Sequence, residues 1–408
     1  MRRIQQPSSG GAFRIVEHDF RTSAASPASA GRRDALVGVV VPTTIELGRQ
    51  ILKGIRRFCS TRAKVRLSLI SDAGYLGQTG GFAGMERFRC LVVYGEGRKA
   101  EDLSAHAPHV VQISNRHPSE MLPRVLTDDR EVGSMGASYL LGLGYRKLVF
   151  LSRRGLQFAA EREDGFVAAA RAAGAELHVL RNWMQETMPD VAQTLLSLGK
   201  DVAVMAPSDL DARWLIEAFD DPESVVPERI AALGVDDDQL ENNLSPIPIS
   251  SIRLPGERIG YEAASLGMRL ADGEAVPEHA QRISPIRVVV RQSTSKLAIN
   301  DETTARALRT IRANIGELQS VTDLCKALKV QRRPMELRFN RILNSSIARE
   351  LTNARIRRAK ELLANPDLSI KEIAYLVGYT EPRRLSIAFR RETGERPIDF
   401  RNRVLPMR

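Results

Sequence analysis

Between Leu36 and Ser293 the hydrophobic positions fall in short continuous runs that alternate with helical stretches. The runs, rich in β-branched residues, read LVGVVV, VRLSLIS, CLVVYG, HVVQIS, KLVFLS, ELHVL, VAVMAP, IAALGV and IRVVVRQS. Continuous apolar strands that alternate with amphipathic helices specify parallel sheets covered on both faces. The total of about ten strands is near the limit of one twisted open sheet, so the pattern favours two layered lobes with a cleft between them.

From Thr303 onward the strand pattern stops and a helical pattern appears twice. Ser320–Val330 and Ser369–Tyr379 both place apolar residues at i, i+3, i+4 and i+7, and both begin with a serine followed three residues later by an acid. This spacing predicts a capping box at the start of each helix. A second helix follows in each copy, in QRRPMELRFNRIL and in EPRRLSIAFRRETG. An apolar inner face and an Arg-rich outer face predict two helix-turn-helix motifs.

The stretch IARELTNARIRRAKELL between the two motifs predicts a helix of its own. At about 1.5 Å per residue, its four to five turns are long enough to hold two reading helices over successive major grooves, roughly 34 Å apart.

Charge separates the two parts of the chain. Residues 303–408 hold 23 Lys+Arg and 11 Asp+Glu, against 60 and 49 in the whole sequence, so this last quarter carries +12 and residues 1–302 carry −1. A basic domain joined to a neutral one indicates contact with a polyanion. No apolar run approaches the roughly 20 residues of a membrane-spanning helix, which favours nucleic acid over a membrane.

These patterns predict a domain order and a compartment. We expect a disordered tail over residues 1–35, an α/β two-lobed sensing domain over 36–292, a linker over 293–302 and an all-α DNA-binding domain over 303–408. Cys59, Cys90 and Cys325 are far apart and form no CxxC motif, which indicates a reducing compartment and no metal site. The tail lacks the apolar segment of a secretory signal, so a cytoplasmic protein is expected.

The basic domain resembles the C-terminal part of AraC-type transcription regulators. The resemblance rests on ARIRRAKELL, on LSIKEIAYLVGYTEPRRLSIAFRRETGERPIDFR, and on the closing Gly394, Pro397 and Phe400. Pro334 and Pro382 depart from the pattern, and both are tolerated in the first turn of a helix. Arginine near the start of a reading helix can fork to guanine O6 and N7 or clamp phosphates. The expected DNA-binding residues are Arg332, Arg333, Glu336, Arg338, Thr380, Arg383, Arg384, Ser386 and Arg390.

The neutral domain is similar to the ligand-sensing half of LacI-type repressors, whose core is similar to periplasmic sugar-binding proteins. The similarity lies in VLTDDREVGSMGASYLLGLGYRKLVFL, AEREDGFVAAARAAG, VMAPSDLDARWLIEAFDD and VPERIAALGVDDDQL. It implies an effector site with Arg162, just before a helix, together with Asp236 and Asp209. Arg49 is expected at the same site, because the loop of residues 42–49 follows the first strand and ligands collect at the carboxyl ends of parallel strands. An arginine fork and a carboxylate suit the vicinal hydroxyls of a monosaccharide such as xylose. Taken singly, such an arginine is more often in a surface ion pair and such an aspartate is more often a helix cap.

The resemblances imply a sequence-specific DNA-binding transcription regulator, active as a homodimer, with a small sugar effector and no cofactor. Two alternatives remain open. An enzyme on a doubly wound fold would need a nucleotide fingerprint after a strand, but the GLG of residues 142–144 ends a helix, and no GKS/GKT, G-x-S-x-G or HExxH motif occurs. A DNA-binding protein that needs no sugar is the second alternative, and failure to bind any pentose or hexose would favour it.

Overall fold

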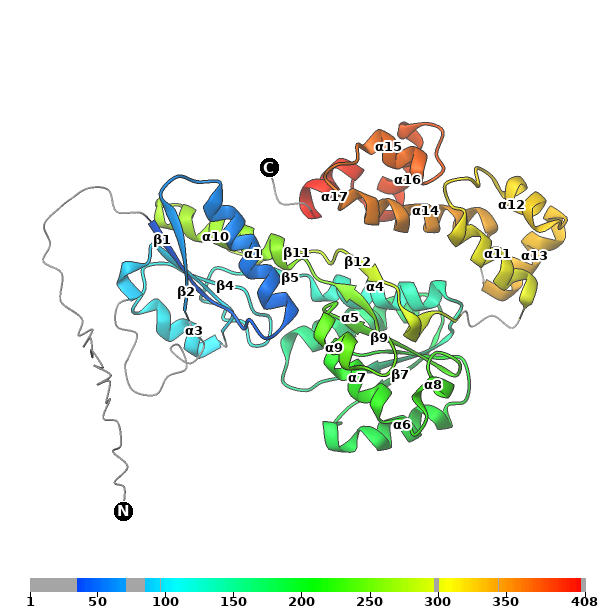
Figure 1. Ribbon diagram of the computed structural model, residues 1–408, viewed down its shortest axis with the longest axis horizontal. Helices are drawn as coiled ribbons and strands as arrows, with labels where there is room; N and C mark the ends of the chain where they lie inside the picture. Colours follow the sequence, from blue (N-terminus) through cyan, green and yellow to red (C-terminus); the bar gives the residue numbers. More distant parts are fainter. Residues whose placement is uncertain (1–34, 71–84, 96, 297–300, 344, 405–408) are drawn as a thin grey trace, which may run out of the picture. The chain divides into compact units, whose positions relative to one another are not determined.

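The computed structural model describes residues 35–70, 85–95, 97–296, 301–343 and 345–404 (Figure 1). Residues 1–34 of the expected tail and residues 297–300 of the expected linker therefore lie outside the described part. Among the described helices none combines the length and the apolar character needed to cross a membrane.

The strands of the described segments form a four-stranded sheet, a six-stranded sheet and a two-stranded sheet. The first has the order β2-β1-β3-β4 and is parallel throughout; the second has the order β12-β10-β9-β8-β6-β7, with only β12 antiparallel. The short parallel pair β5 and β11 makes the third. The strand bounds are β1 Ala35–Val40, β2 Val65–Leu69, β3 Cys90–Val93, β4 Val110–Gln112, β5 Val125–Thr127, β6 Lys147–Leu151, β7 Glu176–Leu180, β8 Val202–Met205, β9 Ile230–Val235, β10 Ser250–Arg253, β11 Gln281–Ile283 and β12 Arg287–Val289.

Helices cover both faces of each large sheet, as the apolar runs predict. In the first lobe, α1 and α10 share a core with Val37 and Val39, whereas α3 packs with Val40 on the other face. In the second lobe, α4 and α5 pack on one face of the six-stranded sheet and α6, α7 and α8 on the other (Figure 1). The helix bounds are α1 Glu46–Ser60, α3 Gly97–Ser104, α4 Asp129–Gly142, α5 Gln157–Ala172, α6 Met188–Ser197, α7 Asp209–Glu217, α8 Pro222–Val225, α9 Gln239–Leu244 and α10 Gly256–Ala271.

Pairs of glycines let neighbouring helices pack at backbone distance in both lobes. In the first lobe, a Cβ on Gly54 would lie 1.9 Å from the Glu257 carbonyl oxygen, and one on Gly260 would lie 2.0 Å from the Ile51 carbonyl oxygen. Helix α10 follows β10 of the second lobe in sequence, and its contact with α1 holds it in the first lobe. Since no side chain fits at these positions, only glycine permits the approach.

The same device joins α4 to α5 in the second lobe. A Cβ on Gly133 would lie 1.8 Å from the Arg162 carbonyl oxygen, and one on Gly165 would lie 1.9 Å from the Arg130 carbonyl oxygen. The close packing sets the side chains of α5 directly against the N-terminal turn of α4. This packing therefore fixes the position from which the Arg162 side chain extends.

The basic part of the chain is helical, as the sequence predicts, and has two cores. Helices α11, α12, α13 and the first half of α14 enclose one core around Phe339; α15, α16, α17 and the second half of α14 enclose another around Phe389. Helix α14 belongs to both, with Leu351 in the first core and Leu363 in the second. The bounds are α11 Glu302–Ala313, α12 Val321–Leu328, α13 Arg332–Leu343, α14 Ile347–Leu363, α15 Ile370–Leu376, α16 Pro382–Thr393 and α17 Pro397–Val404.

The two helix-turn-helix units repeat down to their caps and turns. Ser320 and Ser369 each accept from the backbone amide three residues on, and both capping boxes are complete. Lys329 and Gly378, at the same place in the two turns, both adopt left-handed backbone, with φ of 55° and 82°. Pro382 is the first residue of α16.

The start of the expected linker is packed into the sensor. Ser293 and Thr294, in the short helix η3 (Gln292–Thr294), are fully buried. Ser293 Oγ donates to the Ala232 carbonyl at 2.6 Å and accepts from the Ser250 amide at 2.8 Å. The lack of periodicity made this stretch resemble a linker in the sequence. The Ser293 hydroxyl, however, is the partner of buried backbone groups, and the Thr294 hydroxyl donates to Ser250 Oγ at 2.7 Å.

We predict that Gly165→Ala destabilises the sensor by about 1–3 kcal/mol or more, because the added methyl group must push α5 away from Arg130. This loss would appear although alanine is the better helix former by about 1 kcal/mol. Trp183 and Trp214, the only tryptophans, both lie in the second lobe, so urea unfolding followed by their fluorescence measures it. Ala168→Ser adds one atom on the exposed side of the same helix and is the matched control; equal effects of the two substitutions would contradict the packing argument.

Candidate functional site

Arg162 is the buried cation of the sensor domain. It lies in the second turn of α5, whereas the sequence suggested a position just before a helix; its side chain is only 5% exposed. Its Nε donates to Asp129 Oδ1 at 2.7 Å, Nη1 donates to the Pro207 carbonyl, and the guanidinium lies over the Phe158 ring at 4.7 Å. Burial lowers the pKa of Arg162, but Asp129 and Asp236 raise it, and the net direction is upward. The residue therefore stays charged.

Asp129, at the first position of α4, is the partner that sequence reasoning missed. It is 1% exposed, and its Oδ2 accepts from Asn115 Nδ2 at 2.8 Å. Burial raises the pKa of Asp129, whereas Arg162 and Asn115 oppose the rise. The sequence TDD at residues 127–129 predicts a helix N-cap, and Asp128 is that cap because it accepts from the Glu131 amide. No local pattern indicates that Asp129 points into the protein.

Asp236 follows β9 directly, at the carboxyl edge of the six-stranded sheet, as predicted. Its φ of 112° is in a region that non-glycine residues rarely occupy, and such strain concentrates at functional sites. Burial raises the pKa of Asp236 to about 7; Arg162 lowers it and Asp238 raises it again. Arg162 and Asp236 interact electrostatically. The structure therefore brings these two predicted effector residues into one site.

Asp209 joins the same cluster from the start of α7. It is 2% exposed, and its Oδ2 accepts from the Asp238 backbone amide at 2.8 Å. Burial, and after it the charge of Asp236, raises the pKa of Asp209 well above its usual range. Gly234 faces it from β9, where a Cβ would lie 2.1 Å from Asp209 Oδ1. The cluster is therefore tightly packed around its carboxylates.

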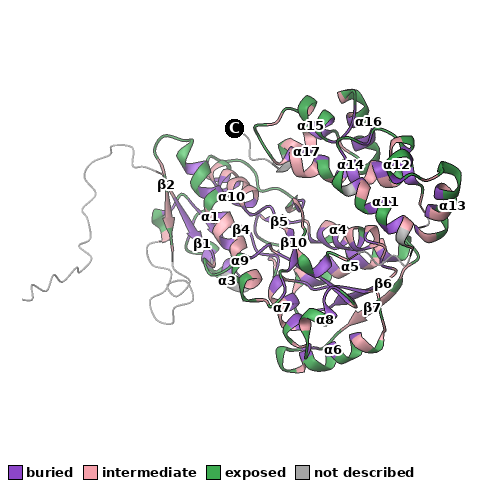
Figure 2. Ribbon diagram, turned by 45° about the vertical axis from the view of Figure 1, so that its right-hand side comes forward, coloured by how far each residue is buried: buried purple, intermediate pink, exposed green. Residues whose placement is uncertain are grey.

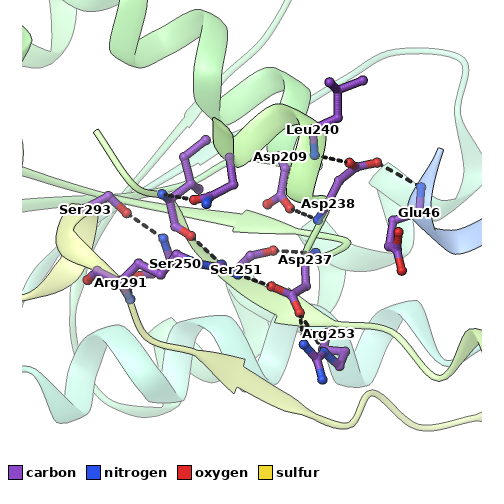
Figure 3. A network of polar contacts seen from close by, with 12 residues as sticks. Glu46, Asp209, Asp237, Asp238, Leu240, Ser250, Ser251, Arg253, Arg291 and Ser293 are labelled. Carbon is purple, nitrogen blue, oxygen red and sulfur yellow. Dashed lines mark hydrogen bonds and ion pairs between the residues drawn. The ribbon is translucent and has the colours of Figure 1, made fainter. Parts of the chain in front are cut away.

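Arg49 lies at the border of the two lobes. Its Nη1 donates to the carbonyls of Thr43 and Thr44, and its Nη2 lies 2.9 Å from Glu46 Oε2 and 3.7 Å from Asp238 Oδ1. The Glu46 amide at the start of α1 donates to Asp238 Oδ2 at 2.8 Å, a contact between residues 192 apart in sequence (Figure 3). Asp238 also caps α9 by accepting from the Leu240 amide. Asp238 thus bridges the two lobes. The sequence DDDQL predicts a helix cap at this position but not the contact with the other lobe.

Asp237 connects the cluster to the segment that leaves the sensor. Its carboxylate accepts from Arg253 Nε at 2.6 Å and from Arg291 Nη2 at 2.5 Å, and its amide donates to Ser251 Oγ at 2.8 Å (Figure 3). Arg291 lies two residues before the buried Ser293. Among the described residues, no group of three or more His, Cys, Asp or Glu side chains is placed to hold a metal ion.

The second candidate site is the outer face of the two reading helices, α13 and α16. Arg333 and Arg383 are exposed in the first turn of each helix, and among the described residues neither side chain has a hydrogen-bond or ion-pair partner. Pro334 also falls in that first turn. Thr380, in the turn before α16, and Arg390, in its last turn, are exposed as well.

Other predicted DNA contacts have partners within the protein. Arg332 Nε donates to Glu336 at 2.8 Å, and Arg384 lies 3.8 Å from Glu381. Ser386 Oγ donates to the Pro382 carbonyl at 3.2 Å. Arg338 pairs with Asp301 Oδ2 at 2.7 Å, beside the start of α11, and its counterpart in α16 is the buried Ala388. These roles stay predictions, and Arg338 is turned towards its own domain.

Comparison with known proteins matches the two parts separately and together. Residues 137–294 match the periplasmic binding protein-like domain family, and residues 324–403 match a helix-turn-helix domain family. The xylose operon regulatory protein of Haemophilus influenzae is 30% identical over 293 residues, which cover 68% of this chain and 74% of the relative. The chain belongs to the family of these xylose operon regulators.

The chain combines a periplasmic-binding-protein-like sensor with an AraC-type helix-turn-helix domain, so it is a DNA-binding transcription regulator. The protein of the same name in Escherichia coli K12 is 26% identical over 299 residues, covering 70% of this chain and 76% of the relative. The fold matches that of a solved structure described as the xylose-binding transcription activator XylR, with a TM-score of 0.55, 21% identity and coverage of 90% of this chain and 97% of the other.

We predict that the stability conferred by Asp236 depends on pH. Its pKa is about 7 in the folded chain and about 3.9 in the unfolded chain, so the folded state binds the extra proton between these values. The stability is present at low pH and is lost as the pH rises towards 7. Asp236→Asn stays neutral, so its unfolding free energy relative to the parent should grow from pH 5 to pH 7, by at most about 1.4 kcal/mol per unit.

Urea unfolding at a series of pH values, followed by tryptophan fluorescence, measures this difference. The control is Asp220→Asn, an exposed position after α7, whose difference from the parent should stay constant. A pH-independent difference for Asp236→Asn would show that burial does not raise this pKa.

Proposed function

We propose that the sensor domain binds a monosaccharide at Arg162, Asp236 and Asp209 and that this binding regulates the action of the DNA-binding domain. The observation that carries the proposal is the buried Arg162 beside Asp236 at the carboxyl edge of a parallel sheet, where ligands of such folds bind. A fixed guanidinium and a carboxylate offer donors and acceptors to adjacent hydroxyl groups. They are held in place before any ligand arrives, which limits the entropic cost of binding.

Xylose is the first effector to test, because the related regulators in two bacteria are named for the xylose operon. We propose sensing, and no catalysis, as the task of the cluster, since the relatives are named as regulators. We also propose that the protein works in the cytoplasm, where operator DNA lies, and that two chains associate as a homodimer. Light scattering on the purified chain measures the association.

We predict that at least one sugar of a panel of pentoses, hexoses and uronic acids binds the full-length protein, measured by titration calorimetry. Asp236→Asn should weaken that binding by roughly 10-fold to 150-fold, the loss expected when a hydrogen bond of about 1.5–3 kcal/mol to a charged group is removed. Asp220→Asn should bind as the parent does. If no sugar binds, the DNA-binding domain acts without this class of effector; if Asp236→Asn binds like the parent, the sugar lies elsewhere.

A separate prediction distinguishes base reading from phosphate contact in α16. N-terminal residues of a reading helix reach base edges, so Arg383→Ala should cost roughly 1–3 kcal/mol on the preferred operator and relax preference at one or two base pairs. Arg390 lies about two turns later, and Arg390→Ala should weaken all sequences alike. Selection from randomised duplexes by both variants measures this. Base reading by Arg383 is excluded if the selected motif of Arg383→Ala equals the parent's at every position.

A further inference from the structure

Each reading helix carries one large apolar side chain on its otherwise basic outer face. Leu337 in α13 is 67% exposed and Ile387 in α16 is 59% exposed. Leu337 lies midway between the buried Met335 and Phe339, and Ile387 has the same relation to the buried Leu385 and Phe389. The two exposed residues therefore occupy the same position in the two copies of the motif.

Arginines flank both residues at helical spacing. Arg333 and Arg341 lie four residues before and after Leu337, and Arg383 and Arg391 lie four residues before and after Ile387. Residues four apart share a helix face, so each helix presents a stripe of arginine, aliphatic residue and arginine. All six side chains are exposed, and Figure 2 shows outer faces of both helices in the exposed colour.

Single exposed apolar residues are ordinary on protein surfaces, so neither residue alone would indicate a ligand. Leu337 and Ile387, however, occupy the same position in both motifs, within stripes of positive charge. Both lie on the helices that enter the major groove in helix-turn-helix proteins, so DNA is the partner that these stripes fit. Among the base edges in that groove, the apolar group is the C5-methyl group of thymine. We propose that Leu337 and Ile387 each contact a thymine methyl group of the operator, and that the pair selects thymine at two positions.

The proposal rests on the docking of α13 and α16 in successive grooves, and it adds two specificity residues and the base that each reads. Four helical residues span about 6 Å, close to two base-pair steps. Each thymine should therefore lie about two base pairs from the contact made by the arginine of the first turn. The two thymines should lie one turn of DNA apart, about 10 base pairs.

The experiment removes the methyl group alone. An operator selected by the full-length protein is synthesised with each thymine replaced in turn by deoxyuridine, and binding is measured by fluorescence anisotropy. For the parent, two replacements about 10 base pairs apart should each weaken binding by about fourfold, the loss expected for one buried methyl group. Ile387→Ala should become insensitive to one of these replacements and Leu337→Ala to the other.

Leu376→Ala is the matched control, because Leu376 is a 50% exposed apolar residue on α15, outside the reading helices. It should keep the full pattern of the parent. The proposal is overturned if no deoxyuridine replacement weakens the parent, or if both alanine variants keep the parent's sensitivity, which would assign the stripes to a protein partner. A parent that selects no operator at all would instead contradict DNA reading by the domain, so the two failures are distinguishable.

Discussion

The sensor site depends on the buried ion pair between Arg162 and Asp129. Two charges removed from water cost several kcal/mol each, and only close geometry with further hydrogen bonds offsets this cost. The Pro207 carbonyl and the Asn115 amide group provide those bonds, and the glycine contacts between α4 and α5 set the distance. Loss of Arg162 would leave Asp129 buried without its cation, a change that typically costs about 3–5 kcal/mol. The packing of α4 against α5 therefore holds the charged Arg162 side chain in position near Asp236.

In the DNA-binding domain the corresponding constraint is the spacing of the two reading helices. Helix α14 lies in both cores, so one rigid element sets the distance between the two units. Arg355, within α14 and 8% exposed, donates to the carbonyls of Leu318 and Gln319 and lies over the Tyr379 ring at 4.7 Å. It therefore ties the loop before α12 to the turn before α16.

The sequence was sufficient for features that depend on local patterns, and insufficient for those that depend on distant contacts. Alternating apolar runs predicted the layered lobes, and serine–acid pairs predicted the starts of α12 and α15. The position of Asp236 at the end of β9 was also predicted, from the resemblance of IAALGVDDDQL to the sensing half of LacI-type repressors. Asp129 and Asp238 were missed, since their partners are 33 and 192 residues away. Ser293 and Thr294 were assigned to the linker because the stretch lacks periodicity, and their buried partners, Ala232 and Ser250, are 61 and 44 residues away.

The remaining question is how a small ligand in the sensor could influence residues beyond it. A ligand shifts an equilibrium only through different affinities for two arrangements, so some element must change with Asp236. Asp236 and Asp237 are consecutive and both have positive φ, so a change in the backbone of one displaces the other. Asp237 binds Arg291, and the Ser250 hydroxyl links Arg291 to Thr294. These bonds form an unbroken polar path from the carboxyl edge of β9 to the last buried residue of the sensor. A rearrangement at Asp236 therefore has a direct physical route to the segment that precedes the DNA-binding domain.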